Sequence, residues 1–120
     1  MKKLLFPILL TFILSGHLLA VAGPPDPVLE AAREAAAGQG STAAAVAQAA
    51  KDVALAEGLD EKEASREAAR ASSRAVAEKE FETSGDATIA GTKAREAAIA
   101  AGVDVEEAED IASEKATQAV

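Results

Sequence analysis

A step of glycine, an apolar residue and aspartate occurs twice in this sequence, 44 residues apart. Each step lies inside a longer stretch, Ala50–Val76 or Ala94–Val120, and ten of the 27 aligned residues in these stretches are identical. Six of the identities are alanine on alanine, which carries little weight in an alanine-rich chain. The other four are Gly58 with Gly102, Asp60 with Asp104, Glu63 with Glu107, and Val76 with Val120. The pattern predicts a duplicated pair of helices.

Each step predicts where one helix ends and the next begins. Gly58 and Gly102 follow alanine-rich runs, and glycine adopts the left-handed conformation that ends a helix without a clash at Cβ. Asp60 and Asp104 come two residues later, each with a glutamate three residues further on, which is the spacing of a helix N-cap with a capping box. The apolar residue between them can pack on both helices. We therefore expect two antiparallel helices in each copy.

The start of the chain has the pattern of a secretory signal peptide. Lys2 and Lys3 precede an almost wholly apolar run at residues 4–19. Ala20-Val21-Ala22 then has small residues at the two positions that a signal peptidase recognises, which predicts cleavage before Gly23. A retained membrane anchor is the alternative, because the run approaches the roughly 18 to 20 residues that a transmembrane helix needs.

Pro7 and Gly16 interrupt the apolar run, and this favours a cleaved signal peptide over an anchor. We expect residues 1–22 to be removed and residues 23–120 to form one alanine-rich helical domain. The product would be secreted, periplasmic or otherwise extracytoplasmic, with no stable membrane association after cleavage.

Charge and composition exclude several classes of function. Removing residues 1–22 takes away two of the 12 basic residues and none of the 20 acidic ones, which leaves a formal charge of −10. Nucleic acids and anionic membranes attract lysine and arginine, so neither is an expected partner. The only histidine, His17, lies in the predicted signal peptide, and the chain has no cysteine. Without an imidazole or a thiol we expect no enzyme, with no catalytic residue, cofactor or metal.

Turn and capping residues divide the rest of the chain into about five expected helices, and no strand signal competes. Asp26 followed by Pro27 is a good start for the first helix, and Ser41 is the expected N-cap of the second. The predicted fold is therefore all-α, a small bundle built from two similar hairpins. The expected helices cover residues 27–37, 42–57, 61–82, 87–101 and 105 to nearly 120.

Alanine recurs at heptad spacing on the third and fourth of these helices. Such seams let helix axes approach closely but remove little apolar area from water. Only fourteen residues after the predicted signal peptide are large and apolar. We therefore expect a marginally stable fold, with self-association as a way to complete it. The seams are Ala64, Ala68, Ala71 and Ala75, and then Ala87, Ala90, Ala94, Ala97 and Ala101.

Two charged clusters are candidates for binding. Arg66, Arg70 and Arg74 lie four residues apart and form a basic strip that could take a phosphate or a polyanion. Glutamates lie three or four residues from each arginine, so intrahelical ion pairs are the favoured interpretation. These glutamates are Glu63, Glu67 and Glu78.

The second cluster is acidic and could attract Ca²⁺. Its spacing is not that of a calcium loop, and it has no glycine at the turn position. Acids in the first turn of a helix complement the helix dipole, and this is the favoured explanation. The cluster comprises Asp104, Glu106, Glu107, Glu109 and Asp110.

Residues 46–54 read Val-Ala-Gln-Ala-Ala-Lys-Asp-Val-Ala, with Gln48 third. This segment resembles the repeated unit of the group 3 late-embryogenesis-abundant proteins, which act in desiccation. The resemblance covers nine residues, and from Glu57 onward the repeat of that family is not continued. It implies a helix that forms conditionally.

The sequence thus predicts a secreted, non-enzymatic structural or interaction protein that acts through small-residue helix packing. Its partner would be a second copy, paired through the alanine seams, or another protein. A conditionally folded stress or desiccation protectant is the alternative. A secreted membrane-active toxin or bacteriocin is less favoured, because the expected charge of −10 opposes binding to anionic lipid.

Overall fold

The computed structural model describes residues 26–120, and the predicted signal peptide and its cleavage site lie outside this part. Within it the chain forms five helices and no strand, which confirms the all-α prediction. The helices are α2 (Pro27–Ala37), α3 (Ala43–Ala56), α4 (Glu61–Ser84), α5 (Ala87–Ala101) and α6 (Val105–Ala119).

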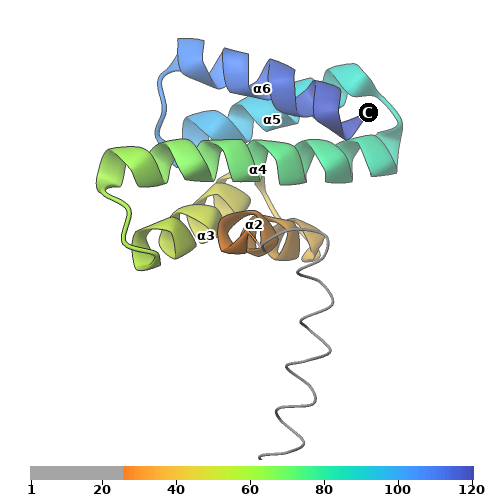
Figure 1. Ribbon diagram of the computed structural model, residues 1–120. Coiled ribbons are helices and arrows are strands. Elements are labelled where there is room, and N and C mark those ends of the chain that lie inside the picture. The colour runs from red at the N-terminus through yellow and green to blue at the C-terminus, as the bar shows by residue number, and fades with distance from the viewer. Residues whose placement is uncertain (1–25) are drawn as a thin grey trace, which may run out of the picture.

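Helix α4 is the centre of the fold, and each of the other four helices packs against it. In Figure 1 α4 crosses the front of the molecule, with α6 above it, α2 below it and α5 behind it. Helix α5 also packs on α3 and α6, whereas α2 packs on α3 and α4. Among the described helices, α2 and α6 make no contact with each other. They flank the exposed side of α4.

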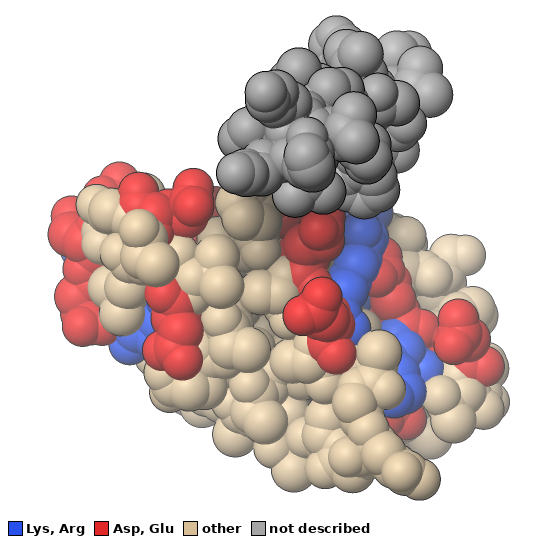
Figure 2. Space-filling model, turned by 90° about the horizontal axis from the view of Figure 1, so that it is seen from below, with Lys and Arg blue, Asp and Glu red and all other residues tan. Residues whose placement is uncertain are grey.

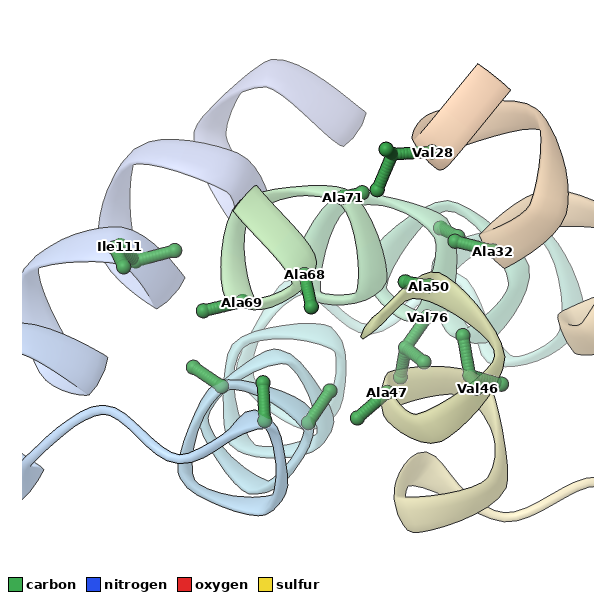
Figure 3. Packing of buried hydrophobic residues seen from close by; sticks show 14 of the residues in the cluster. Val28, Ala32, Val46, Ala47, Ala50, Ala68, Ala69, Ala71, Val76 and Ile111 are labelled. Carbon is green, nitrogen blue, oxygen red and sulfur yellow. The ribbon is translucent and has the colours of Figure 1, made fainter. Parts of the chain in front are cut away.

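The core of the described part consists mostly of alanine. All but four of its buried apolar residues are alanines. Figure 3 shows Val28 of α2 beside Ala71 of α4, within a core of short side chains. Methyl groups at these contacts let helix axes approach closely, but they bury little apolar area per turn. The four exceptions are Val28, Val46, Val76 and Ile111.

Two serines of α4 are fully buried and hydrogen-bonded. Ser72 Oγ donates to the main-chain oxygen of Ala68, one turn earlier, at 2.6 Å. Ser73 Oγ donates across the helix contact to the main-chain oxygen of Ala94 in α5, at 2.8 Å. A short side chain reaches the main chain of a neighbouring helix only where the two helices are very close. The α4–α5 contact is therefore tightly packed at Ala94.

The glycines of the repeated step end their helices in the predicted way. Gly58 has φ +96° and Gly102 has φ +111°. At the end of α3, the Gly58 N–H donates to Leu55 O at 3.0 Å and the Leu59 N–H donates to Ala54 O at 3.3 Å. These are the two hydrogen bonds of a Schellman motif. Leu59 also packs against the core, as Val103 does at the second step.

The aspartates of the step begin the next helices, again as predicted. Asp60 Oδ1 accepts from the Glu63 N–H, and Asp104 Oδ1 accepts from the Glu107 N–H, both at 2.8 Å. The Glu63 N–H lowers the pKa of the Asp60 carboxyl, because the hydrogen bond favours the charged form. The same local geometry thus starts α4 and α6.

The predicted N-cap of α3 is wrong by one residue. Thr42, not Ser41, caps this helix, and its Oγ1 accepts from the Ala45 N–H at 3.1 Å. Ser41 Oγ instead donates to Ala36 O near the end of α2, at 3.2 Å. Lys79 Nζ of α4 donates to the same carbonyl at 2.7 Å. Either of two adjacent hydroxyl residues can cap a helix. Ser41 binds a carbonyl at the end of α2 here, which leaves Thr42 as the cap of α3.

We predict that Gly102→Ala destabilises the fold more than Gly58→Ala. Both place a side chain at positive φ, which costs about 1 kcal/mol or more. A Cβ at Gly58 meets nothing within 4 Å, whereas a Cβ at Gly102 lies 3.1 Å from Ser65 Oγ. Thermal melts followed by circular dichroism measure both costs. In a Ser65→Ala background the two costs should become equal, and a difference that persists there would contradict the steric explanation.

Candidate functional site

The arginine strip of α4 lies in a groove between α2 and α6. A hollow of about 160 Å³ is lined there by Arg70 and Arg74 of α4, by Leu29 of α2, and by Lys115 of α6. A larger hollow of about 590 Å³ shares Arg70 with it and includes Arg66, near the α3–α4 turn. We call this surface, with Arg66, Arg70 and Arg74 along it, the arginine groove. Its three arginines all come from one face of α4.

Each of the three arginines is paired with a carboxylate. Arg66 Nε lies 3.0 Å from Glu107 Oε2 of α6, so the predicted pair with Glu63 is wrong. Arg70 Nη1 lies 3.3 Å from Glu67 Oε1, which agrees with the predicted intrahelical pair. The Arg66 pair joins the two repeated stretches. Arg66 pairs with this tertiary partner because Glu107 lies in the first turn of α6, which packs on α4.

Glu78 is the most strongly bound carboxylate near the groove. Arg33 of α2 donates to both of its oxygens, at 3.0 and 2.9 Å, and Arg74 Nε donates to Oε2 at 3.1 Å. The Arg33 hydrogen bond lowers the pKa of Glu78 below its ordinary value of about 4.5; partial burial opposes this, and Arg74 adds to the lowering. The same contact raises the pKa of Arg33. A two-oxygen pair of this kind fixes α2 on α4.

The acidic cluster does not gather into one site. Asp104 caps α6, Glu107 binds Arg66, and Glu109 Oε2 lies 3.4 Å from Arg95 Nε of α5. Glu106 and Asp110 are exposed. The described part of the chain has no group of three His, Cys, Asp or Glu residues placed to hold a metal ion.

A further hollow of about 390 Å³ lies where the α2–α3 connection meets α4 and α5. Val46 and Val76 are among its lining residues, as are Lys79 and Lys93. Lys79 binds Ala36 O, and Lys93 Nζ lies 3.6 Å from Glu96 Oε1. Both lysines already have an oxygen partner.

Neighbouring carboxylates neutralise the positive charges of the arginine groove. Figure 2 looks onto the α2 side of the molecule and shows basic side chains bordered by acidic ones. A phosphate or polyanion at the groove would meet a carboxylate beside each arginine, and repulsion between like charges opposes its binding. Gln48, in the segment that resembles the desiccation proteins, bonds only locally, from Nε2 to Asp52 Oδ1 at 2.8 Å. None of the helices in residues 26–120 has the length and apolarity that crossing a bilayer requires.

Sequence reasoning missed two residues that hold α2 on α4, Arg33 and Lys79. Both act across 43 or more residues of chain, on Glu78 and on Ala36 O. Spacing rules along one helix cannot find such contacts.

Comparison with known proteins gives no matching family model, no matching curated protein and no matching solved structure.

We predict that the Glu78 contacts make stability sensitive to acid. The folded-state pKa is lowered, so the contribution is present above the ordinary value of about 4.5 and is lost as the pH falls through the lowered value. Glu78→Gln should therefore cost up to about 1 kcal/mol at neutral pH, since partly exposed pairs are weak. Melting temperatures of both proteins from about pH 3 to pH 7 measure the effect. The two curves should converge at the acid end, and parallel curves would contradict the assignment.

Proposed function

We propose that this chain is an exported, non-enzymatic structural or interaction protein that works through small-residue helix packing, with a second copy of itself or another protein. The supporting observation is that nearly all buried apolar side chains of the described part are alanines. Helices with such surfaces associate closely, and a marginal core gains stability by mass action when it associates. The carboxylates that pair with the arginine groove fit a packing role better than an anion site.

The two repeated stretches are proposed to be copies of one helical hairpin. Gly58 and Gly102 both have left-handed backbones, and Asp60 and Asp104 accept the same N-cap hydrogen bond at the same distance. A duplicated hairpin carries surfaces that already fit one another. This favours packing between similar units.

Export is proposed from residues 1–22. Signal-peptide cleavage before Gly23 places the protein outside the cytoplasm, in a periplasm or the medium. Intact-mass analysis of the exported protein tests it, with a chain beginning at Gly23 as the expected result. A product that retains Met1 to Ala22 would instead indicate a membrane anchor.

The packing role is tested by the dependence of stability on protein concentration. We expect strong helicity in dilute neutral buffer, a melting temperature that rises with concentration, and a sedimentation coefficient above that of a monomer. A concentration-independent monomer would contradict self-association, and a pull-down from the exported fraction would then look for another partner.

A conditionally folded protectant is the second candidate, favoured by how small the core is. The largest fully buried side chains are Val46, Ser72 and Ser73. In this case the chain should be largely unordered in dilute buffer and become helical on drying or in alcohol, at any concentration. Far-ultraviolet circular dichroism at low concentration separates the two candidates.

A further inference from the structure

The alanine seams are already used inside a single chain. Eight of the nine seam residues are at most 6% exposed, and only Ala87 lies at the surface. A second chain therefore reaches these methyl groups only if a helix of the bundle moves away. Such a movement requires a connection between helices that can change its conformation.

Three of the four connections are held by contacts with other parts of the fold. The α2–α3 connection is fixed at Ala36 O by Ser41 and, across the fold, by Lys79. The α3–α4 and α5–α6 turns pack Leu59 and Val103 against the core. Moving any of these three turns breaks a tertiary contact.

The α4–α5 connection has no such contact among the described residues. Residues 82–89 are all exposed, and a Cβ on Gly85 would meet nothing within 4 Å. Its hydrogen bonds are local: the Gly85 N–H donates to Phe81 O, the Asp86 N–H to Ser84 Oγ, and the Thr88 N–H to Asp86 Oδ1. Gly85 reverses the chain with φ +71°. Glycine adopts helical φ as readily, and α4 would then continue into α5.

We propose that the protein forms a dimer by exchange at Gly85, in which α5 and α6 of each chain pack on α3 and α4 of the other. This rests on the proposed function and assigns its partner as a second copy. The exchanged unit finds a complementary surface by construction, because it is the surface that it covers within one chain. The Ser73–Ala94 hydrogen bond and the Arg66–Glu107 ion pair re-form between chains.

The core makes this exchange accessible. Apart from Ile111, the buried apolar residues of α5 and α6 are all alanines, so separation exposes little apolar area for each helix turn. Local opening of such a unit needs less than global unfolding. A short connection that can straighten is a known setting for domain exchange.

Two engineered disulfides distinguish exchange from other forms of association, and the chain has no cysteine of its own. A Cβ at Gly102 lies 3.7 Å from Ser65 Cβ, and a Cβ at Gly91 lies 3.9 Å from Ala116 Cβ. Both spacings suit a disulfide. Ser65→Cys/Gly102→Cys links α4 to the exchanged unit, so it joins two chains only in an exchanged dimer. Gly91→Cys/Ala116→Cys lies within the exchanged unit and is the matched control.

The whole chain, as the expressing cell processes it, is incubated over a roughly hundredfold range of concentration, oxidised and run on a non-reducing gel. For the first variant we expect disulfide-linked dimers, whose fraction rises with protein concentration. For the control we expect only monomers with an intrachain disulfide, at every concentration. Covalent dimers of both variants would overturn the proposal, because they indicate random cross-linking. Covalent monomers of both would also overturn it. Sedimentation then tests the self-association of the proposed function separately. Dimers would be consistent with self-association by another route, and monomers would contradict self-association as well.

A second test avoids placing a cysteine at Gly102, where the backbone is left-handed. Gly85→Ala disfavours the reversed backbone and favours a continuous helix, so the dimer should become at least about tenfold tighter. Gly91→Ala makes the same change inside α5, where the new Cβ makes only an ordinary contact at 3.9 Å, and should leave the dimerisation constant unchanged. Sedimentation equilibrium measures both. Equal constants for the two variants would overturn the hinge.

Discussion

Replacing Ala94 by leucine is expected to destabilise the fold by about 3 kcal/mol. Ala94 is fully buried in α5, and its main-chain oxygen accepts the hydrogen bond from Ser73 Oγ at 2.8 Å. Helices α4 and α5 are therefore so close that the three additional carbon atoms of leucine fit only if the helices move apart. Since a small domain has only about 5 to 15 kcal/mol of stability, such a loss is a substantial fraction of it.

Ala100→Leu is the matched control for this prediction. Ala100 lies in the same helix and is exposed, so the change should stay within about 0.5 kcal/mol. Chemical denaturation of both variants, followed by circular dichroism, measures the difference. Equal stabilities would show that α4 and α5 are not held together at alanine-sized spacing.

The turns of this fold could be predicted from the sequence because their causes are local. A helix stops at Gly58 and Gly102 through backbone bonds within five residues, and Asp60 and Asp104 cap through bonds to the third residue on. These geometries need no information from the rest of the chain. The prediction failed at Ser41 because a carbonyl of α2 and a distant lysine share in that choice.

The arginine groove shows the same limit. Intrahelical pairs at three or four residues stabilise by only about 0.2 to 0.5 kcal/mol, so a tertiary partner of equal chemistry easily replaces them. Arg66 therefore binds Glu107, while Arg70 keeps its local partner Glu67. The role of Arg33 follows from the packing of α2 on α4, which no spacing rule along one helix predicts.

The seam positions were predictable from heptad spacing, but the burial or exposure of the large apolar residues was not. Only four of the fourteen are buried, and several stay at the surface, including Leu55 and Ile99 at matching positions of the two aligned stretches. Alanine occupies the interfaces because the helices approach too closely for larger side chains. Heptad spacing along one helix does not say which of the large side chains enter the core.

Ile111 of α6 is one of those that enter, and Ile111→Ala is expected to cost about 3 kcal/mol. Ile111 is 8% exposed, and Figure 3 shows its side chain directed towards Ala69 of α4. The other buried residues of this core are mostly alanines, whose side chains are too short to fill the space that truncation leaves. The cavity cost therefore adds to the lost transfer free energy.

Val105→Ala separates this packing effect from any change in helix propensity. Val105 lies at the start of the same helix and is 51% exposed, so its truncation should change stability by no more than about 0.5 kcal/mol. Chemical denaturation at one protein concentration compares the two variants. A loss below about 1 kcal/mol for Ile111→Ala would mean that α6 is loosely attached to α4 and that its few large side chains add little to the alanine contacts.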